Sequence, residues 1–217
     1  MSNLSIAARY SIVLSMVLGG GAPALAQSVG AYDDTWYRAT FWTGEYPAGF
    51  SVLKDTTIQL RPRLDPKAER TVACDLPAKA TYQPWNIARA EEQGLAFVSF
   101  TKMAEYRLTQ DYEATLYRSD DATEQQVTFK AGDAWRYLTY YAEGAFLMEY
   151  EGVRYDGDQS LLDVSEQVSS AEGYEEWLRI NCPNNQWGWL YMGDIAVDDV
   201  TFAAPNITGY GEAKDLD

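Results

Sequence analysis

The sequence predicts a mainly β protein with one or two short helical turns. Aromatic residues make up 14% of the chain, and such side chains favour the pleated, half-buried surface of a sheet. Apolar runs are short and are broken by Gly, Pro, Asp and Asn, which is typical of strands joined by tight turns. Only two segments have helical character, 86–93 (NIARAEEQ) and 160–168 (SLLDVSEQV), and Ser160 can cap the second.

The first 26 residues have the layout of a secretory signal peptide. Arg9 precedes an apolar run over 11–18, and ALA at 24–26 is a small-x-small cleavage pattern. The run is far shorter than the roughly 20 residues that a membrane-crossing helix needs. We therefore expect cleavage after Ala26 and a periplasmic or secreted protein with no membrane attachment after cleavage. An uncleaved anchor or a core helix is the alternative.

The chain carries 32 acidic and 17 basic residues, which gives a formal net charge of −15. Loss of Arg9 with the signal peptide would make the mature chain more negative by one charge. Nucleic acid and anionic membrane surfaces repel such a protein, whereas basic proteins, amines and divalent cations are attracted to it. High charge also keeps an exported protein soluble, so charge alone identifies no partner.

The chain has two cysteines, Cys74 and Cys182. In an exported chain an even pair predicts a disulfide, and two free thiols are the alternative. In the chain-entropy view, closing a loop of about 100 residues stabilises a fold by up to about 4.7 kcal/mol. The bond would tie the first third of the chain to the last quarter.

A β-hairpin is predicted over 177–192. The segment 177–182 (WLRINC) alternates in polarity, which is strand periodicity, and PNNQ at 183–186 has the composition of a turn. The segment 187–192 (WGWLYM) alternates again and places its three aromatic residues opposite Leu190. If the aliphatic face is the core, the aromatic face is exposed or lies under a neighbouring part of the chain.

This hairpin resembles the closing part of bacterial SH3-like (SH3b-type) domains, in which a tryptophan strand and a polar turn precede Gly-Trp and an aliphatic residue. An opening half of the same pattern occurs upstream at 57–82, with PAKA at 77–80 as its turn. The residues that match the closing pattern are Trp177, the NCPNNQ turn, Gly188, Trp189 and Leu190.

A second copy of the pattern occurs over 114–157, with KAG at 130–132 as its turn; chance likeness among aromatic-rich β chains is the alternative. The resemblance implies tandem small SH3-like β-barrels. The expected organisation is a signal peptide (1–26), an N-terminal lead-in (27–50), SH3-like module 1 (51–110), SH3-like module 2 (112–163), a closing hairpin packed on an upstream module (174–200) and a flexible acidic tail (201–217).

Several catalytic chemistries are absent from the sequence. The chain has no histidine, which removes Ser-His-Asp and Cys-His hydrolysis and most zinc sites. A carboxylate pair could still hydrolyse a glycoside, but with 32 acidic residues any pair looks suggestive. We therefore expect a non-enzymatic protein with no catalytic residue, no cofactor and no metal. The acids considered for a glycosidase are Glu143, Glu149, Glu151, Asp156 and Asp158.

Aromatic side chains are the best candidates for ligand contact, because SH3-like domains bind extended peptides in grooves lined by aromatic rings. Packing between modules is the alternative role. The candidate ligand-binding residues are Trp85, Trp135, Trp177, Trp187, Trp189 and Tyr191.

The resemblance implies an exported binding or scaffold protein of the bacterial cell envelope. Its expected partner is a cell-wall peptide or a basic protein, and nucleic acid is not expected. A periplasmic enzyme inhibitor or immunity-type protein is the second hypothesis, and a carboxylate-based cell-wall glycosidase is the third.

Overall fold

The fold is mainly β, as predicted, and the single α-helix in the described part of the chain is α2 (Gln159–Asp163). The predicted signal peptide, Trp85 and the helical turn predicted over 86–93 lie outside the described residues. The computed structural model describes residues 31–44, 49–84, 94–169, 173–208 and 212–217.

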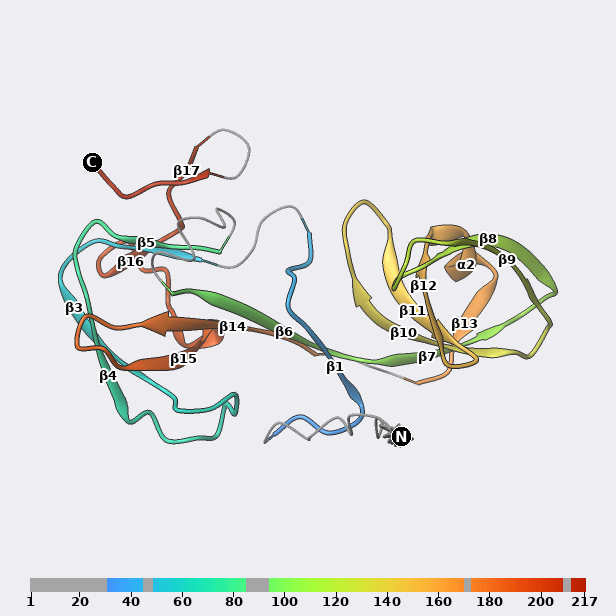
Figure 1. Cartoon of the computed structure of the whole chain (residues 1–217), viewed down its shortest axis with the longest axis horizontal. Coiled ribbons are helices and arrows are strands. Elements are labelled where there is room, and N and C mark those ends of the chain that lie inside the picture. Colours follow the sequence, from blue (N-terminus) through green and yellow to red (C-terminus); the bar gives the residue numbers. More distant parts are fainter. Residues whose placement is uncertain (1–30, 45–48, 85–93, 170–172, 209–211) are drawn as a thin grey trace, which may run out of the picture.

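The strands form two lobes at opposite ends of an elongated molecule (Figure 1). We call them the disulfide lobe, built from the described residues before 103 and after 172, and the seven-stranded lobe, built from 104–169. Strands β6 (Ala96–Lys102) and β7 (Ala104–Leu108) are separated by one residue and run from the first lobe into the second.

The disulfide lobe contains a four-stranded sheet in the order β1-β6-β14-β15, a three-stranded sheet in the order β16-β2-β5, and the strand pairs β3–β4 and β17–β18. All of these pairings are antiparallel. The bounds are β1 (Trp36–Ala39), β2 (Phe50–Val52), β3 (Thr56–Leu60), β4 (Val72–Leu76), β5 (Thr81–Tyr82), β14 (Tyr174–Asn181), β15 (Trp187–Tyr191), β16 (Phe202–Ala203), β17 (Ile207–Thr208) and β18 (Glu212–Ala213).

The predicted hairpin is confirmed as β14 and β15, and its aliphatic face lies in the core of the disulfide lobe. Leu178 is opposite Leu190 and Ile180 is opposite Gly188. These leucines and the isoleucine are buried in one apolar cluster. A Cβ at Gly188 would lie 2.6 Å from the Cβ of Leu60, so this close approach of two strands requires glycine.

Strand β14 also pairs with β6, which comes about eighty residues earlier in the chain. Trp177 is opposite Val98 and Leu178 is opposite Phe97. The hairpin therefore extends a sheet begun by upstream strands, and the whole seven-stranded lobe is inserted between β6 and β14 (Figure 1).

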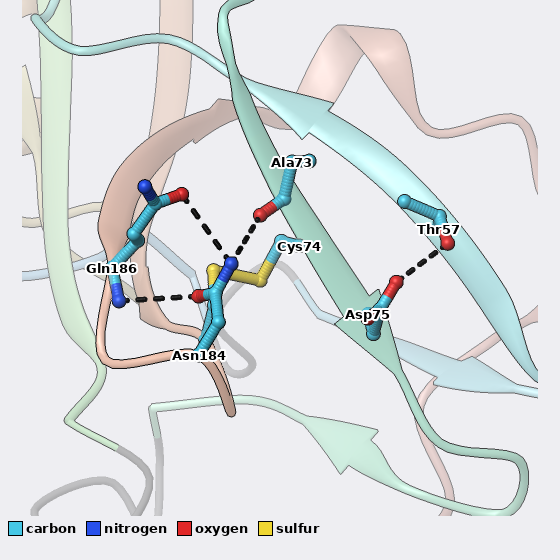
Figure 2. The surroundings of a disulfide bond; sticks show 7 residues. Thr57, Ala73, Cys74, Asp75, Asn184 and Gln186 are labelled. Carbon is cyan, nitrogen blue, oxygen red and sulfur yellow. Dashed lines mark hydrogen bonds between the residues drawn. A yellow bond between two sulfur atoms is a disulfide. The ribbon is translucent and has the colours of Figure 1, made fainter.

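The predicted disulfide between Cys74 and Cys182 is confirmed, with a Cα–Cα distance of 5.2 Å. Both residues belong to the buried core of the disulfide lobe. Figure 2 shows a second link beside the bond, where the Asn184 side chain amide donates to the carbonyl oxygen of Ala73 at 3.3 Å. The Gln186 backbone N–H donates to the Asn184 side chain at 3.1 Å. The turn of the hairpin is thus fixed to β4 covalently and by hydrogen bonding.

The seven-stranded lobe is one antiparallel sheet in the order β13-β7-β10-β11-β12-β8-β9. Its buried face surrounds a second apolar core that includes Phe129, Trp135, Phe146 and Met148, and α2 adds Leu161 to this core. The bounds are β8 (Tyr112–Arg118), β9 (Glu124–Phe129), β10 (Ala134–Tyr140), β11 (Phe146–Tyr150), β12 (Val153–Gly157) and β13 (Ser165–Gln167).

No sheet in the described ranges closes into a barrel, and the tandem SH3-like barrels are not confirmed. In the seven-stranded sheet, the edge strands β9 and β13 do not pair with each other. Strand β7 lies within predicted module 1 (51–110) and pairs with β10, which lies within predicted module 2 (112–163). The boundary expected near residue 111 therefore falls inside one sheet, because the β6–β7 segment enters both lobes.

The helix predicted over 160–168 is confirmed only in its first half. It ends at Asp163, and its N-cap is Asp158 rather than Ser160, because the Asp158 carboxylate accepts the Ser160 backbone N–H at 2.9 Å. The following residues form β13 and pair with β7. Hydrogen bonds across the sheet therefore replace a second helical turn.

The flexible tail predicted over 201–217 is not what the structure shows for the described residues of this segment. Strand β16 pairs with β2, and Phe202 packs edge-on against Phe50 with ring centroids 5.4 Å apart. Near the end of the chain, the Leu216 N–H donates to the Lys79 carbonyl oxygen at 2.8 Å. An apolar anchor and backbone hydrogen bonds hold the segment against the disulfide lobe.

Reduction of the Cys74–Cys182 bond is expected to lower the free energy of unfolding by about 2–4 kcal/mol, because the unfolded chain regains the freedom of a long closed loop. Urea unfolding of the purified protein with and without reductant measures this difference. The double variant Cys74→Ala/Cys182→Ala is the control, since reductant cannot change its midpoint. Equal midpoints for the wild-type protein under both conditions, with two thiols that react in the native state, would contradict the disulfide.

Candidate functional site

Four of the six predicted ligand-binding residues lie on one face of the β14–β15 hairpin. Trp177 and Tyr191 are opposite each other across the two strands. Trp189 and Trp187 follow at alternate positions, so the predicted strand parity is confirmed. We call the side of the hairpin that bears Trp177, Trp187, Trp189 and Tyr191 the aromatic face.

The other two predicted residues do not join this face. Trp135 lies in the seven-stranded lobe, where it is buried and stacks on Tyr106 with ring centroids 4.7 Å apart. Its indole N–H donates to the Ser165 hydroxyl at 3.0 Å. Trp135 is therefore a core residue with its one polar atom satisfied, and Trp85 lies outside the described residues.

Trp177 is the covered end of the aromatic face. It is fully buried, and its indole N–H donates to the Tyr32 hydroxyl at 2.7 Å. Tyr32 in turn donates to the Glu175 carboxylate and stacks on Phe100. Burial and the Glu175 carboxylate both raise the pKa of Tyr32, which keeps the phenol protonated as a donor. This network fastens the segment before β1 onto the sheet and leaves no access to Trp177.

A buried arginine closes the free edge of β15. The Arg61 N–H donates to the Trp189 carbonyl at 2.9 Å, and the Trp189 N–H donates to the Arg61 carbonyl at 2.7 Å. The buried Arg61 guanidinium forms an ion pair with Asp194 and lies 5.7 Å from the centroid of the Trp177 ring. Arg70 reaches the same carboxylate at 2.6 Å. The backbone pairing and the two ion pairs thereby hold the edge strand β15 in place.

The exposed end of the aromatic face combines tryptophan with an arginine. Trp187 is 46% exposed, and the Arg179 guanidinium carbon lies 4.4 Å from the centroid of its ring. Arg179 is half-buried, and its Nε is buried without a hydrogen-bond partner. It has no ion pair with any residue in the described part of the chain. We call Arg179, Trp187, Trp189 and Tyr191 the exposed strip. Of its three rings Trp187 is exposed, whereas Trp189 and Tyr191 are half-buried and pack against the apolar cluster that contains Trp177.

A separate cleft of about 500 Å³ lies where the two lobes meet. Sequence reasoning did not find it, because its residues come from four separate segments and form no motif. The only sequence signal was a general richness in tyrosine. Its lining includes Tyr37, Phe41, Tyr141, Leu147, Glu149 and Arg154.

The five acids considered for a glycosidase have contacts that do not suit an acid–base pair. Asp158 caps α2, and Glu149 lies 3.5 Å from Arg136 and 3.9 Å from Arg154. Glu143 and Glu151 occupy positive-φ positions, at 54° and 50°, and are exposed. Asp156 is half-buried on β12 with one carboxylate oxygen that has no hydrogen-bond partner. No arrangement typical of an acid–base pair emerges from these contacts.

The described residues contain no group of three or more Cys, Asp or Glu side chains placed to hold a metal ion. None of their helical segments has the length and apolar character of a membrane span.

Comparison with known proteins gives no relative. No family model matches the chain, and neither a curated protein nor a solved structure matches it.

Replacing Trp177 by Ala is expected to lower the free energy of unfolding by about 3–5 kcal/mol, because a fully buried ring is lost. The same change at Trp187, on the same face of the hairpin, should cost no more than about 0.5 kcal/mol, since that ring is exposed. Urea unfolding followed by circular dichroism measures both. A large loss of stability in the Trp187 variant would show that this ring serves packing and is not free for a ligand.

Proposed function

We propose that the chain is an exported, non-enzymatic binding protein of the bacterial cell envelope that holds an extended peptide segment along the exposed strip. The observation that carries the proposal is the Arg179 guanidinium, which lies on the exposed Trp187 ring and has no carboxylate partner among the described residues. In a chain with nearly twice as many acidic as basic residues, such an arginine is available to a carboxylate from outside.

The chemistry of the strip suits peptide recognition. Arginine presents several N–H donors in a fixed planar fork, which suits a carboxylate or a row of carbonyl groups. Tryptophan and tyrosine supply wide, rigid contact area with a polar tip. Together with arginine, they are the residues most enriched at energetically dominant positions of interfaces. Trp187, Trp189 and Arg179 bring these properties together on two neighbouring strands.

The strip is built on a rigid base, which lowers the entropic cost of binding. The disulfide and Asn184 fix the turn of the hairpin to β4. Strand β6 and the backbone of Arg61 hold its two sides. A ligand would therefore meet side chains that are already in place.

A ligand with both charges fits the surface best. A carboxylate would pair with Arg179, while amino groups would be attracted by the acidic remainder of the chain. Cell-wall peptides, the class that the SH3-like resemblance implies, are compatible with this requirement, and so is a basic segment of a protein partner. The SH3-like identity of the hairpin and its export both belong to this proposal.

Sedimentation of the purified mature protein with cell-wall sacculi tests the proposal. We expect the wild-type protein to pellet with sacculi. Arg179→Gln should weaken binding by about tenfold, the effect of losing one charge-assisted contact. Trp187→Ala should weaken it by about tenfold as well, because an aromatic contact is lost. Arg107→Gln is the control, because Arg107 is also a strand arginine but is exposed and lies in the seven-stranded lobe.

Equal binding by all four proteins would rule out the strip as the binding surface. Absence of binding to sacculi, together with a tight complex with a cell-wall hydrolase in a pull-down, would favour the inhibitor hypothesis instead.

A further inference from the structure

The cleft between the lobes has the size and position of a small-molecule site. Its volume of about 500 Å³ lies within the usual range of ligand pockets, and such pockets occur preferentially where two structural units meet. One wall comes from Tyr37 of β1 and from Phe41. The seven-stranded lobe contributes residues 118–120, Tyr141 and part of the β11–β12 hairpin. Strand β1 crosses between the two lobes (Figure 1).

The walls of the cleft are fixed to each other by contacts between the lobes. The hydroxyls of Thr101 and Thr139 are hydrogen-bonded at 2.7 Å. The Gly44 N–H donates to the Tyr141 carbonyl oxygen at 2.6 Å, and the Phe41 and Tyr141 rings lie 5.3 Å apart. The cleft is therefore formed before any ligand enters, which favours binding.

Three aromatic rings give the cleft its apolar lining. Tyr37, Phe41 and Tyr141 are all half-buried, so each keeps part of its ring open to a ligand. Burial raises the pKa of both Tyr37 and Tyr141, so their hydroxyls stay neutral. A flat apolar body can stack on or pack against these rings.

Arg154 is the arginine of the cleft with hydrogen-bonding capacity to spare. Its guanidinium lies 5.5 Å from the Tyr37 ring centroid. Among the described residues its nearest carboxylate contact is Glu149 at 3.9 Å, beyond hydrogen-bonding distance. Glu149 is shared with Arg136, which is closer at 3.5 Å. By contrast, the second arginine of the cleft, Arg118, forms two hydrogen bonds to Asp120, at 3.0 and 2.7 Å.

Opposite charges stand side by side on this wall. Arg154 and Glu149 are cross-strand partners on β12 and β11, and both line the cleft. An α-amino acid carries a carboxylate and an ammonium group a short distance apart, and this pair of charges is complementary to the Arg154–Glu149 pair. The neighbouring rings then define what the side chain of such a ligand should be.

We propose that the cleft is a second binding site, for a small amino-acid-type ligand with an aromatic side chain. The ligand carboxylate binds Arg154, its ammonium group binds Glu149, and its ring packs among Tyr37, Phe41 and Tyr141. This site is distinct from the exposed strip and does not depend on the function proposed for the strip.

Isothermal titration calorimetry on the mature protein tests the site with three probes. They are L-phenylalanine, L-phenylalanine amide, which lacks the carboxylate, and N-acetyl-L-phenylalanine, which lacks the ammonium group. We expect L-phenylalanine to bind, and each analogue to bind at least about tenfold more weakly, because each leaves one charged group of the cleft without its partner. Absence of L-phenylalanine binding at millimolar concentrations, or equal binding of all three probes, would overturn the proposal.

Two matched variants locate the binding. Arg154→Gln is expected to weaken L-phenylalanine binding by about tenfold. Arg136→Gln should not weaken it, because Arg136 contacts the same Glu149 but is absent from the lining of the cleft. Both arginines are about half exposed, so neither change should affect folding, which circular dichroism checks.

An equal loss of L-phenylalanine affinity in both variants would overturn the assignment. It would show that binding depends on the charge around Glu149 and not on contact with Arg154. Arg179→Gln separates this site from the exposed strip. It should leave L-phenylalanine binding intact, and a loss in this variant would place the ligand on the strip.

Discussion

The antiparallel pairing of β6 with β14 is the constraint on which the rest of the structure depends. These strands carry the chain out of the disulfide lobe and back into it, so the seven-stranded lobe is an insertion between two hydrogen-bonded neighbours. Their register also decides which side chains of β14 face the core. A slip by one residue would exchange Leu178 and Trp177 between the two faces. The aromatic face and the junction that forms the cleft both follow from this one pairing.

Aromatic residues with the same strand parity have different roles here because their surroundings differ. Trp177 is covered by Tyr32 and approached by the Arg61 guanidinium, whereas Trp187 is met by Arg179 and remains open. Parity along a strand sets the face of a side chain, but segments distant in the sequence determine whether that face is covered. Coverage by other segments likewise makes Trp135 a core residue, whereas the Trp187 ring remains exposed.

Local patterns in the sequence predicted the β class, the hairpin and its two faces, and the cysteine pair predicted the disulfide. Features that depend on distant contacts were not predictable in this way. The boundary expected near residue 111 failed to anticipate that β7 and β10 share a sheet. No local signal marks the point at which the chain passes from β6 in one sheet to β7 in another. The segment after 201 lacks periodicity, yet Phe202 and backbone pairing hold it. The cleft assembles Tyr37, Tyr141 and Arg154 from strands and loops that only the tertiary fold brings together.

The position of the disulfide has a mechanical consequence. It joins two residues 108 positions apart, and the whole seven-stranded lobe lies within the covalent loop so formed. A pulling force applied to the two ends of the chain would pass from Cys74 to Cys182 through the sulfur atoms and bypass that lobe. As long as the disulfide is intact, the disulfide lobe would bear the pulling force. The inserted lobe and its sheet would carry none of it.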